Sequence, residues 1–210
     1  MKKPDRENLI ASTTDFAMHI VNAYLKPGDT VVDATCGNGY DTLSLARMLM
    51  QVDSEELTGK IYAFDVQEQA IAGTRELLTD NGFSQFLSAG LIELIHDSHE
   101  NIRKYFSGSC SAVIFNLGYL PGGDKSITTE SESTIATVRN VLGIGDAPSL
   151  LAKGGILCIT MYSGHEAGAA EKARLLAFAA ELDPGKYHTS YISMPNQKNN
   201  PPEILLISIK

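Results

Sequence analysis

The sequence lacks any apolar stretch of about 18 residues, which is the length that a helix needs to cross a membrane. Its basic start, MKKPDRENLI, is not followed by the apolar segment that a signal peptide carries. We therefore expect a cytoplasmic protein with no membrane contact. With 210 residues, 43% of them hydrophobic and 20% charged, the chain has the size and composition of one globular domain, residues 1–210.

Cysteine is scarce, and its placement is informative. The three cysteines, Cys36, Cys110 and Cys158, lie far apart and form no C-x-x-C pair. An odd and dispersed set of this kind indicates reduced thiols in a reducing compartment. His96 and His99 lie close together in sequence, but no further metal-ligand residue except an aspartate lies near them, so we expect no metal site.

Basic residues are outnumbered by acidic ones, 17 to 25, which gives a net charge of -8. This balance excludes a general nucleic-acid coat protein, which would be basic, and we expect no DNA partner. It is compatible with an RNA-modifying enzyme that has a local basic patch. The candidates for such a patch are Lys2, Lys3, Arg6, Arg103, Lys104, Lys125, Lys186 and Lys198.

Apolar runs alternate with amphipathic patterns along the chain. The predicted strands cover 30–34, 60–66, 91–95, 110–116 and 154–164, and the predicted helices cover 12–25, 41–50, 67–82, 131–151 and 166–182. Two strand patterns, 186–194 and 202–210, follow without a helix between them, so they must pair as a hairpin and one strand must run antiparallel. The alternation predicts an α/β fold with a doubly wound, Rossmann-like, mostly parallel sheet that binds ligands at the carboxyl ends of its strands.

The stretch VVDATCGNGYDT contains a strand, a glycine loop and the start of a helix. Gly37 and Gly39 match the first two glycines of a dinucleotide-binding turn, but Thr42 occupies the third position. Asp41 places a carboxylate at the start of the helix, where it would repel a pyrophosphate. These two facts argue against NAD or FAD and favour a nucleoside ligand without phosphates, such as S-adenosylmethionine, whose methionine part the glycine backbone can approach.

Acidic and polar residues follow three successive predicted strands. Asp33 and Asp41 could accept hydrogen bonds from the amino group of S-adenosylmethionine, directly or through water. Asp65 ends the second strand and could accept from two ribose hydroxyls, because one carboxylate can accept both. Asp97 and Ser98 follow the third strand and could meet the exocyclic amine of the adenine.

Four segments, VVDATCGNGYDT, AFDVQ, HDSHENI and NLGYLPGGDK, resemble in this order the class I methyltransferases. More closely they resemble the rRNA methylase family, the YtqB-like proteins, whose members are understood as tRNA 5-aminomethyl-2-thiouridine methyltransferases. The resemblance covers essentially the whole chain. It implies a seven-stranded sheet with an antiparallel last strand, S-adenosylmethionine as cofactor and a tRNA substrate. It also implies cofactor contacts from Asn38, Asp41, Asp65, Gln67, Ser98 and His99.

The segment after the fourth predicted strand reads NLGY, where amine methyltransferases of this class often have N-P-P-Y. It departs from that pattern at both proline positions. The Asn116 carbonyl could accept the hydrogens of an amine and aim its lone pair, with most of the rate coming from orientation. Tyr119 could pack against the uracil or the amine. A base is also needed, and Asp124, His165 and Tyr162 are the candidates.

Together these patterns predict an S-adenosylmethionine-dependent N-methyltransferase that methylates the 5-aminomethyl group of the wobble (2-thio)uridine in tRNA. One alternative is a methyltransferase for rRNA or for a small molecule, and the acidic net charge favours the small molecule. Alternatives of other classes are an NAD-dependent oxidoreductase and a non-catalytic nucleotide-binding module. The sequence shows no added RNA-binding domain, so the catalytic domain would hold tRNA itself, across a homodimer if the chain forms one.

Overall fold

The computed structural model describes residues 10, 12–50, 57–118 and 131–210. Within them, seven strands form one sheet in the order β3-β2-β1-β4-β5-β7-β6. Their bounds are β1 Thr30–Asp33, β2 Lys60–Asp65, β3 Ile92–His96, β4 Cys110–Leu117, β5 Leu151–Met161, β6 Tyr187–Ile192 and β7 Glu203–Ile209. The first five strands are parallel, and β7 runs antiparallel to both β5 and β6. The predicted mostly parallel sheet with an antiparallel last strand is confirmed.

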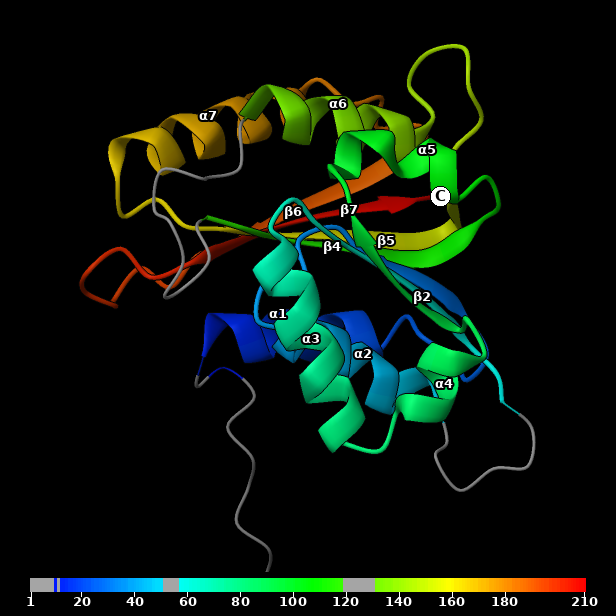
Figure 1. The fold of residues 1–210 in the computed structure, drawn as a ribbon. Coiled ribbons are helices and arrows are strands. Elements are labelled where there is room, and N and C mark those ends of the chain that lie inside the picture. Colours follow the sequence, from blue (N-terminus) through cyan, green and yellow to red (C-terminus); the bar gives the residue numbers. More distant parts are fainter. Residues whose placement is uncertain (1–9, 11, 51–56, 119–130) are drawn as a thin grey trace, which may run out of the picture.

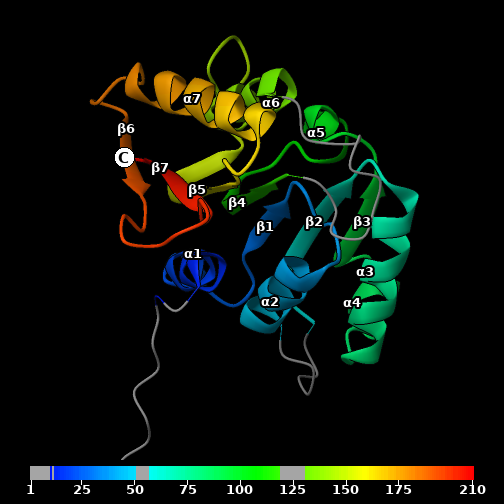
Figure 2. The same ribbon diagram turned by 90° about the vertical axis from the view of Figure 1, so that its left-hand side faces the viewer.

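Helices cover both faces of the sheet (Figures 1 and 2). One face carries α1 (Thr13–Asn22), α2 (Tyr40–Leu49), α3 (Glu68–Asp80) and α4 (Ser84–Ser88), and the other carries α5 (Ile102–Tyr105), α6 (Ser131–Leu142) and α7 (Glu166–Ala180). The short elements α4, α5 and the 3-10 turn η1 (His99–Asn101) were not predicted. No helix in the described part of the chain is long and apolar enough to span a membrane.

The central strands are buried on both faces, which explains why they read as continuous apolar runs. Along β4, Val113 and Phe115 pack into the apolar cluster under α6 and α7, whereas Ala112 and Ile114 pack into the cluster on the face of α1 and α2. This alternation follows from the two-residue period of a strand. The three cysteines belong to the same interior and are free and buried.

The predicted helix over 131–151 is too long, because α6 ends at Leu142. Gly143 follows with φ of 68°, and the Ile144 N–H donates to the Arg139 carbonyl at 2.9 Å, which closes the helix end. The Ser149 hydroxyl then donates to the Val141 carbonyl at 2.8 Å and fixes the turn. As a result β5 begins at Leu151, three residues earlier than predicted.

The chain order reverses between β1 and β4, which are neighbours in the sheet. Segments that leave the carboxyl ends of these two strands turn to opposite faces, so a crevice forms between them. In such folds this is where ligands bind. The position of the crevice therefore follows from strand order alone.

Candidate functional site

A pocket of about 910 Å³ lies at the carboxyl ends of the parallel strands. Its volume is in the range of sites for cofactors and drug-sized ligands. Of the predicted site residues, those that line it are Gly37, Asn38, Asp41, Asp65, Gln67, Asp97, Ser98, His99 and Asn116. The structure does not place Asp33, Gly39 or Thr42 in this lining. Tyr119 lies outside the described residues.

The glycine loop joins β1 to α2 and packs against α3. Gly37 and Gly39 both have positive φ, 52° and 81°. A Cβ added at Gly39 would lie 2.8 Å from the Thr74 Oγ1 and 2.9 Å from the Thr74 Cα. The Thr74 hydroxyl in turn donates to the Gly37 carbonyl at 3.2 Å. Gly39 therefore serves the contact between the loop and α3, while Gly37 faces the pocket.

Asp33 and Thr42 hold the glycine loop from beneath. The Thr42 hydroxyl donates to the Asp33 Oδ2 at 2.6 Å, and the Thr35 N–H donates to the Oδ1 at 3.2 Å. Both side chains are buried, with 1% and 0% exposure. Burial, with a further contribution from the Asp41 carboxylate, raises the pKa of Asp33 to about 7. The residue at the third-glycine position thus supplies a hydroxyl to a buried acid instead of space for a pyrophosphate.

Asp65 ends β2 and connects two pocket segments. Its Oδ2 accepts from the Gly37 N–H at 2.9 Å, and its Oδ1 accepts from the Gln67 N–H at 2.9 Å. Each carboxylate oxygen keeps a second lone pair after these bonds. The carboxylate is therefore fixed by the backbone and can still accept from a ligand in the pocket that it lines.

Asp97 and Ser98 follow β3. The Asp97 Oδ1 accepts from the Ser98 N–H at 2.7 Å and from the Asn101 Nδ2 at 2.8 Å, and its Oδ2 accepts from the Tyr105 hydroxyl at 2.9 Å. The Asn101 hydrogen bond is the main reason that the pKa of Asp97 lies below its usual value. Asp97 is therefore an ionised residue that organises the loop after β3 and lines the pocket.

His99 is buried, and its tautomer follows from its partner. The Thr137 hydroxyl donates its proton to the Ser133 carbonyl at 2.9 Å, so its oxygen accepts from the His99 Nδ1–H at 2.9 Å. Burial lowers the pKa of His99 to about 4, so the ring is neutral and its Nε2 is an acceptor. His96 has a different partner, the Val66 carbonyl at 3.0 Å. The described residues contain no group of three or more potential metal ligands.

Asn116 lies near the end of β4 and is held by hydrogen bonds at two atoms. Its N–H donates to the Thr35 hydroxyl at 2.7 Å, and its Nδ2 donates to the Asp41 Oδ2 at 3.1 Å. Its Oδ1 is buried and has no hydrogen-bond partner in the described part of the chain. Burial raises the pKa of Asp41, and the Asn116 hydrogen bond opposes that rise. The pocket therefore contains a carboxamide whose amide nitrogen is held by Asp41 and whose oxygen accepts no hydrogen bond from the described residues.

Tyr162 and His165, two of the predicted bases, follow β5 and line the pocket. His165 caps α7, and its Nδ1 accepts from the Gly168 N–H at 3.0 Å, so the acceptor nitrogen is already used. Burial, followed by the Asp41 carboxylate, raises the pKa of Tyr162, so the phenol keeps its proton. Neither group is well suited to take a proton from a substrate. The third candidate, Asp124, lies outside the described residues.

Of the basic residues considered for an RNA-binding patch, Arg103 has an internal role. Its guanidinium donates to the Asn140 carbonyl at 2.5 Å and to the Pro148 carbonyl at 2.6 Å, tying α5 to α6 and to the segment between α6 and β5. Lys2, Lys3, Arg6 and Lys125 lie outside the described residues.

Several pocket residues were not predicted from the sequence. Thr35 could have been found, because it lies two residues after the end of β1 and thus at the ligand-binding edge. Thr14 and Ser133 come from α1 and α6, and no local pattern marks them as pocket residues. Asn200 comes from the polar loop before β7, whose composition, PNQKNNP, was the signal available.

Comparisons with known proteins agree with this architecture. The family model described as "Putative rRNA methylase" matches residues 61–208. The chain is 37% identical over 170 residues to the chloroplastic tRNA (mnm5s2U34)-methyltransferase of Arabidopsis thaliana, which covers 80% of this chain. The matched part spans 59% of that relative, less than two thirds of its length.

Two solved structures are similar over nearly their whole length. A protein of Clostridium thermocellum described as "putative rRNA-methylase" superposes with a TM-score of 0.83 and 36% identity, covering 95% of this chain and 98% of that one. SMU.1697c of Streptococcus mutans, described as "a putative methyltransferase" in complex with SAH, superposes with a TM-score of 0.77 and 33% identity, covering 94% and 97%.

Proposed function

The chain belongs to the rRNA methylase family and has the fold of the class I methyltransferases, and from that premise we propose that it is an S-adenosylmethionine-dependent N-methyltransferase. We propose as its substrate the 5-aminomethyl group of the wobble (2-thio)uridine in tRNA. Residues 1–210 would act as one catalytic domain in the cytoplasm. The similarity to the tRNA methyltransferase of Arabidopsis thaliana favours tRNA over the rRNA and small-molecule alternatives.

The observation that carries this proposal is the state of the Asn116 carboxamide. Its Nδ2 donates to Asp41, and its buried Oδ1 has no partner among the described residues. A buried acceptor without a partner costs about 1–3 kcal/mol of folding free energy. Such a group is expected at a site where a bound ligand donates the missing hydrogen bond. A primary amine has the hydrogens that this oxygen needs.

The pocket also fits the proposed cofactor. Asp41 and Asp65 offer carboxylate acceptors to an amino group and to ribose hydroxyls, while Gly37, Asn38 and Gln67 contribute the loop segments around them. The Asp41 carboxylate at the first turn of α2 would repel a pyrophosphate, which argues against an NAD-dependent oxidoreductase. When bound, S-adenosylmethionine supplies an electrophilic methyl group on a sulfonium.

The residues around Asn116 can prepare an amine for methylation. An aminomethyl group is an ammonium in water, so it must lose a proton before its lone pair becomes available. Asp41 is the candidate acceptor for that proton, because burial raises its pKa and it adjoins Asn116. The Asn116 Oδ1 then accepts a hydrogen of the neutral amine and holds the lone pair in one direction.

The test is methyl transfer from labelled S-adenosylmethionine to total RNA from cells that lack this gene. tRNA and rRNA are separated and digested to nucleosides, and RNA from cells that contain the gene is the control. We expect label in a methylaminomethyl-uridine of tRNA and much less label in the control RNA, which is already methylated. Label in rRNA alone would overturn the target, and no label in either RNA, with cofactor binding shown separately, would favour a small-molecule substrate.

A further inference from the structure

The loop between β6 and β7 contains the only two non-glycine residues with positive φ in the described part of the chain. Asn199 has φ of 67° and Asn200 has φ of 48°. Glycine adopts this left-handed conformation freely, and asparagine is among the few other residues that tolerate it. Two consecutive asparagines keep the backbone shape and add two carboxamides, so the side chains need an explanation of their own.

Only one of the two asparagines lines the pocket. Asn200 lines it together with Asn116 and Tyr162, whereas Asn199 does not. Both residues are exposed, so neither is explained by core packing. Figure 1 shows the loop, coloured orange to red, at the end of the sheet where β5 leads into α7.

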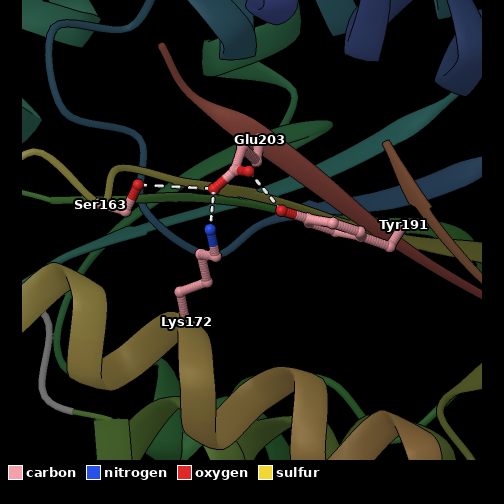
Figure 3. A network of polar contacts seen from close by, with 4 residues as sticks. All are labelled: Ser163, Lys172, Tyr191 and Glu203. Atoms are coloured by element: carbon pink, nitrogen blue, oxygen red, sulfur yellow. Dashed lines mark hydrogen bonds and ion pairs between the residues drawn. The ribbon is translucent and has the colours of Figure 1, made fainter. Parts of the chain in front are cut away.

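The two stems of the loop are anchored by a polar network (Figure 3). Glu203, the first residue of β7, forms an ion pair with Lys172 of α7 and accepts a hydrogen bond from the Tyr191 hydroxyl of β6. It also accepts from the Ser163 hydroxyl at 3.4 Å, directly beside Tyr162. The network thus joins both ends of the loop to the segment after β5.

A second contact holds the loop near α1. The Thr13 hydroxyl donates to the Met194 sulfur at 3.6 Å, which ties the start of the loop to the first turn of that helix. Thr14, the next residue of α1, also lines the pocket. These contacts hold both ends of the loop beside the pocket that Asn200 lines.

We propose that Asn200 is a substrate-positioning residue whose carboxamide binds the hydrogen-bonding edge of the pyrimidine base. A uracil edge has an N3–H donor flanked by acceptors at positions 2 and 4, and a carboxamide carries one acceptor and two donors. A wobble base is single-stranded, so this edge is free for such a contact. The amide is neutral and adds no charge beside Asp41 and Asp65. This inference rests on the proposed function.

The test compares Asn200→Gly with Asn199→Gly. Both changes allow the positive φ, so neither strains the loop, but only the first removes a carboxamide from the pocket. The substrate is tRNA with 5-aminomethyl-2-thiouridine from cells lacking this gene. We expect kcat/KM for this tRNA to fall about 10- to 100-fold in Asn200→Gly, mainly through KM, and to stay within about twofold in Asn199→Gly.

Two further measurements separate a role in substrate binding from an effect on cofactor binding or on folding. The Kd for S-adenosylmethionine and the melting temperature should be unchanged in both variants. An unchanged kcat/KM in Asn200→Gly, an equal loss in Asn199→Gly, or a loss that follows weaker cofactor binding would overturn the role of Asn200 alone. A wild-type protein that transfers no methyl group to this tRNA would overturn the proposed function, and this inference with it.

Discussion

The two halves of the pocket differ in how far the protein satisfies its own polar groups. In the cofactor half, formed after β1, β2 and β3, Asp65 and Asp97 accept two and three hydrogen bonds from the chain, and Asp33 beneath the glycine loop accepts two. In the substrate half, formed after β4 and β5 and before β7, the buried acceptor of Asn116 has no donor among the described residues and Asn200 is exposed with a positive φ. Hydrogen bonds from the chain fix the acids of the first half, and Asp65 keeps lone pairs for a ligand, whereas the described residues supply no donor to the Asn116 acceptor of the second half.

The largest expected effect comes from Asn116→Ala, which removes the unused acceptor of the substrate half. We expect the single-turnover rate of methyl transfer to fall about 100- to 1,000-fold, as for the loss of a preorganised polar group at a reacting centre. Cofactor affinity should fall far less, because the change removes one hydrogen bond to Asp41 and leaves the backbone contacts of Asp65 intact. The measurements are rapid-quench kinetics and calorimetric titration. A parallel loss of cofactor affinity would show that the halves are not separate.

Gly39→Ala should instead destabilise the packing of the glycine loop in the cofactor half. The new Cβ would lie 2.8 Å from the Thr74 Oγ1 at a φ of 81°, so both overpacking and backbone strain oppose folding. We expect a loss of about 2–4 kcal/mol in the free energy of unfolding by urea. Gly73→Ala is the matched control, because its Cβ meets nothing within 4 Å inside α3, and it should stabilise by about 0.5–1 kcal/mol. Equal effects of the two changes would refute the packing argument.

A smaller effect concerns the buried acid beneath the glycine loop. Asp33 has a pKa of about 7 in the folded protein and an ordinary pKa of 3.8, so between these values the folded state holds a proton that the unfolded state has lost. Stability from this group is present below about pH 4 and is lost as the pH rises to 7.

Replacing Asp33 by Asn removes that titration while keeping the size of the side chain. From pH 5 to pH 8 the wild-type protein should lose about 2–3 kcal/mol of unfolding free energy relative to Asp33→Asn. Urea titrations of both proteins at four pH values measure this difference. Parallel stability curves would mean that Asp33 is ionised throughout and that its contact with Thr42 outweighs its burial.

The sequence predicted the cofactor half better than the substrate half for a physical reason. The acids of the cofactor half directly follow strands, and strand order alone brings them to one edge of the sheet. The sequence pattern does not show whether a side chain near the end of a strand faces the pocket or is buried under the glycine loop. Asp33 and Thr42 were therefore expected at the ligand, although they lie beneath the loop.

In the substrate half, the pocket residues come from segments that are distant in sequence. Thr14 precedes the sheet and Asn200 comes from the closing hairpin, and only tertiary packing brings them together. The end of α6 was missed for a local reason, because the Gly143 turn lies inside a stretch with helical periodicity. The helical pattern of the sequence continues through this turn, but the helix itself ends there.

The burial of all three cysteines gives the native protein its own set of unfolding reporters. Burial raises the pKa of Cys110 and Cys158 to about 12, and it also raises that of Cys36, so none is a thiolate at neutral pH in the folded state. A thiol reagent therefore reacts only when the surrounding structure opens. Because Cys36 lies in the glycine loop and Cys158 within β5, the order of their modification records which half of the pocket opens first.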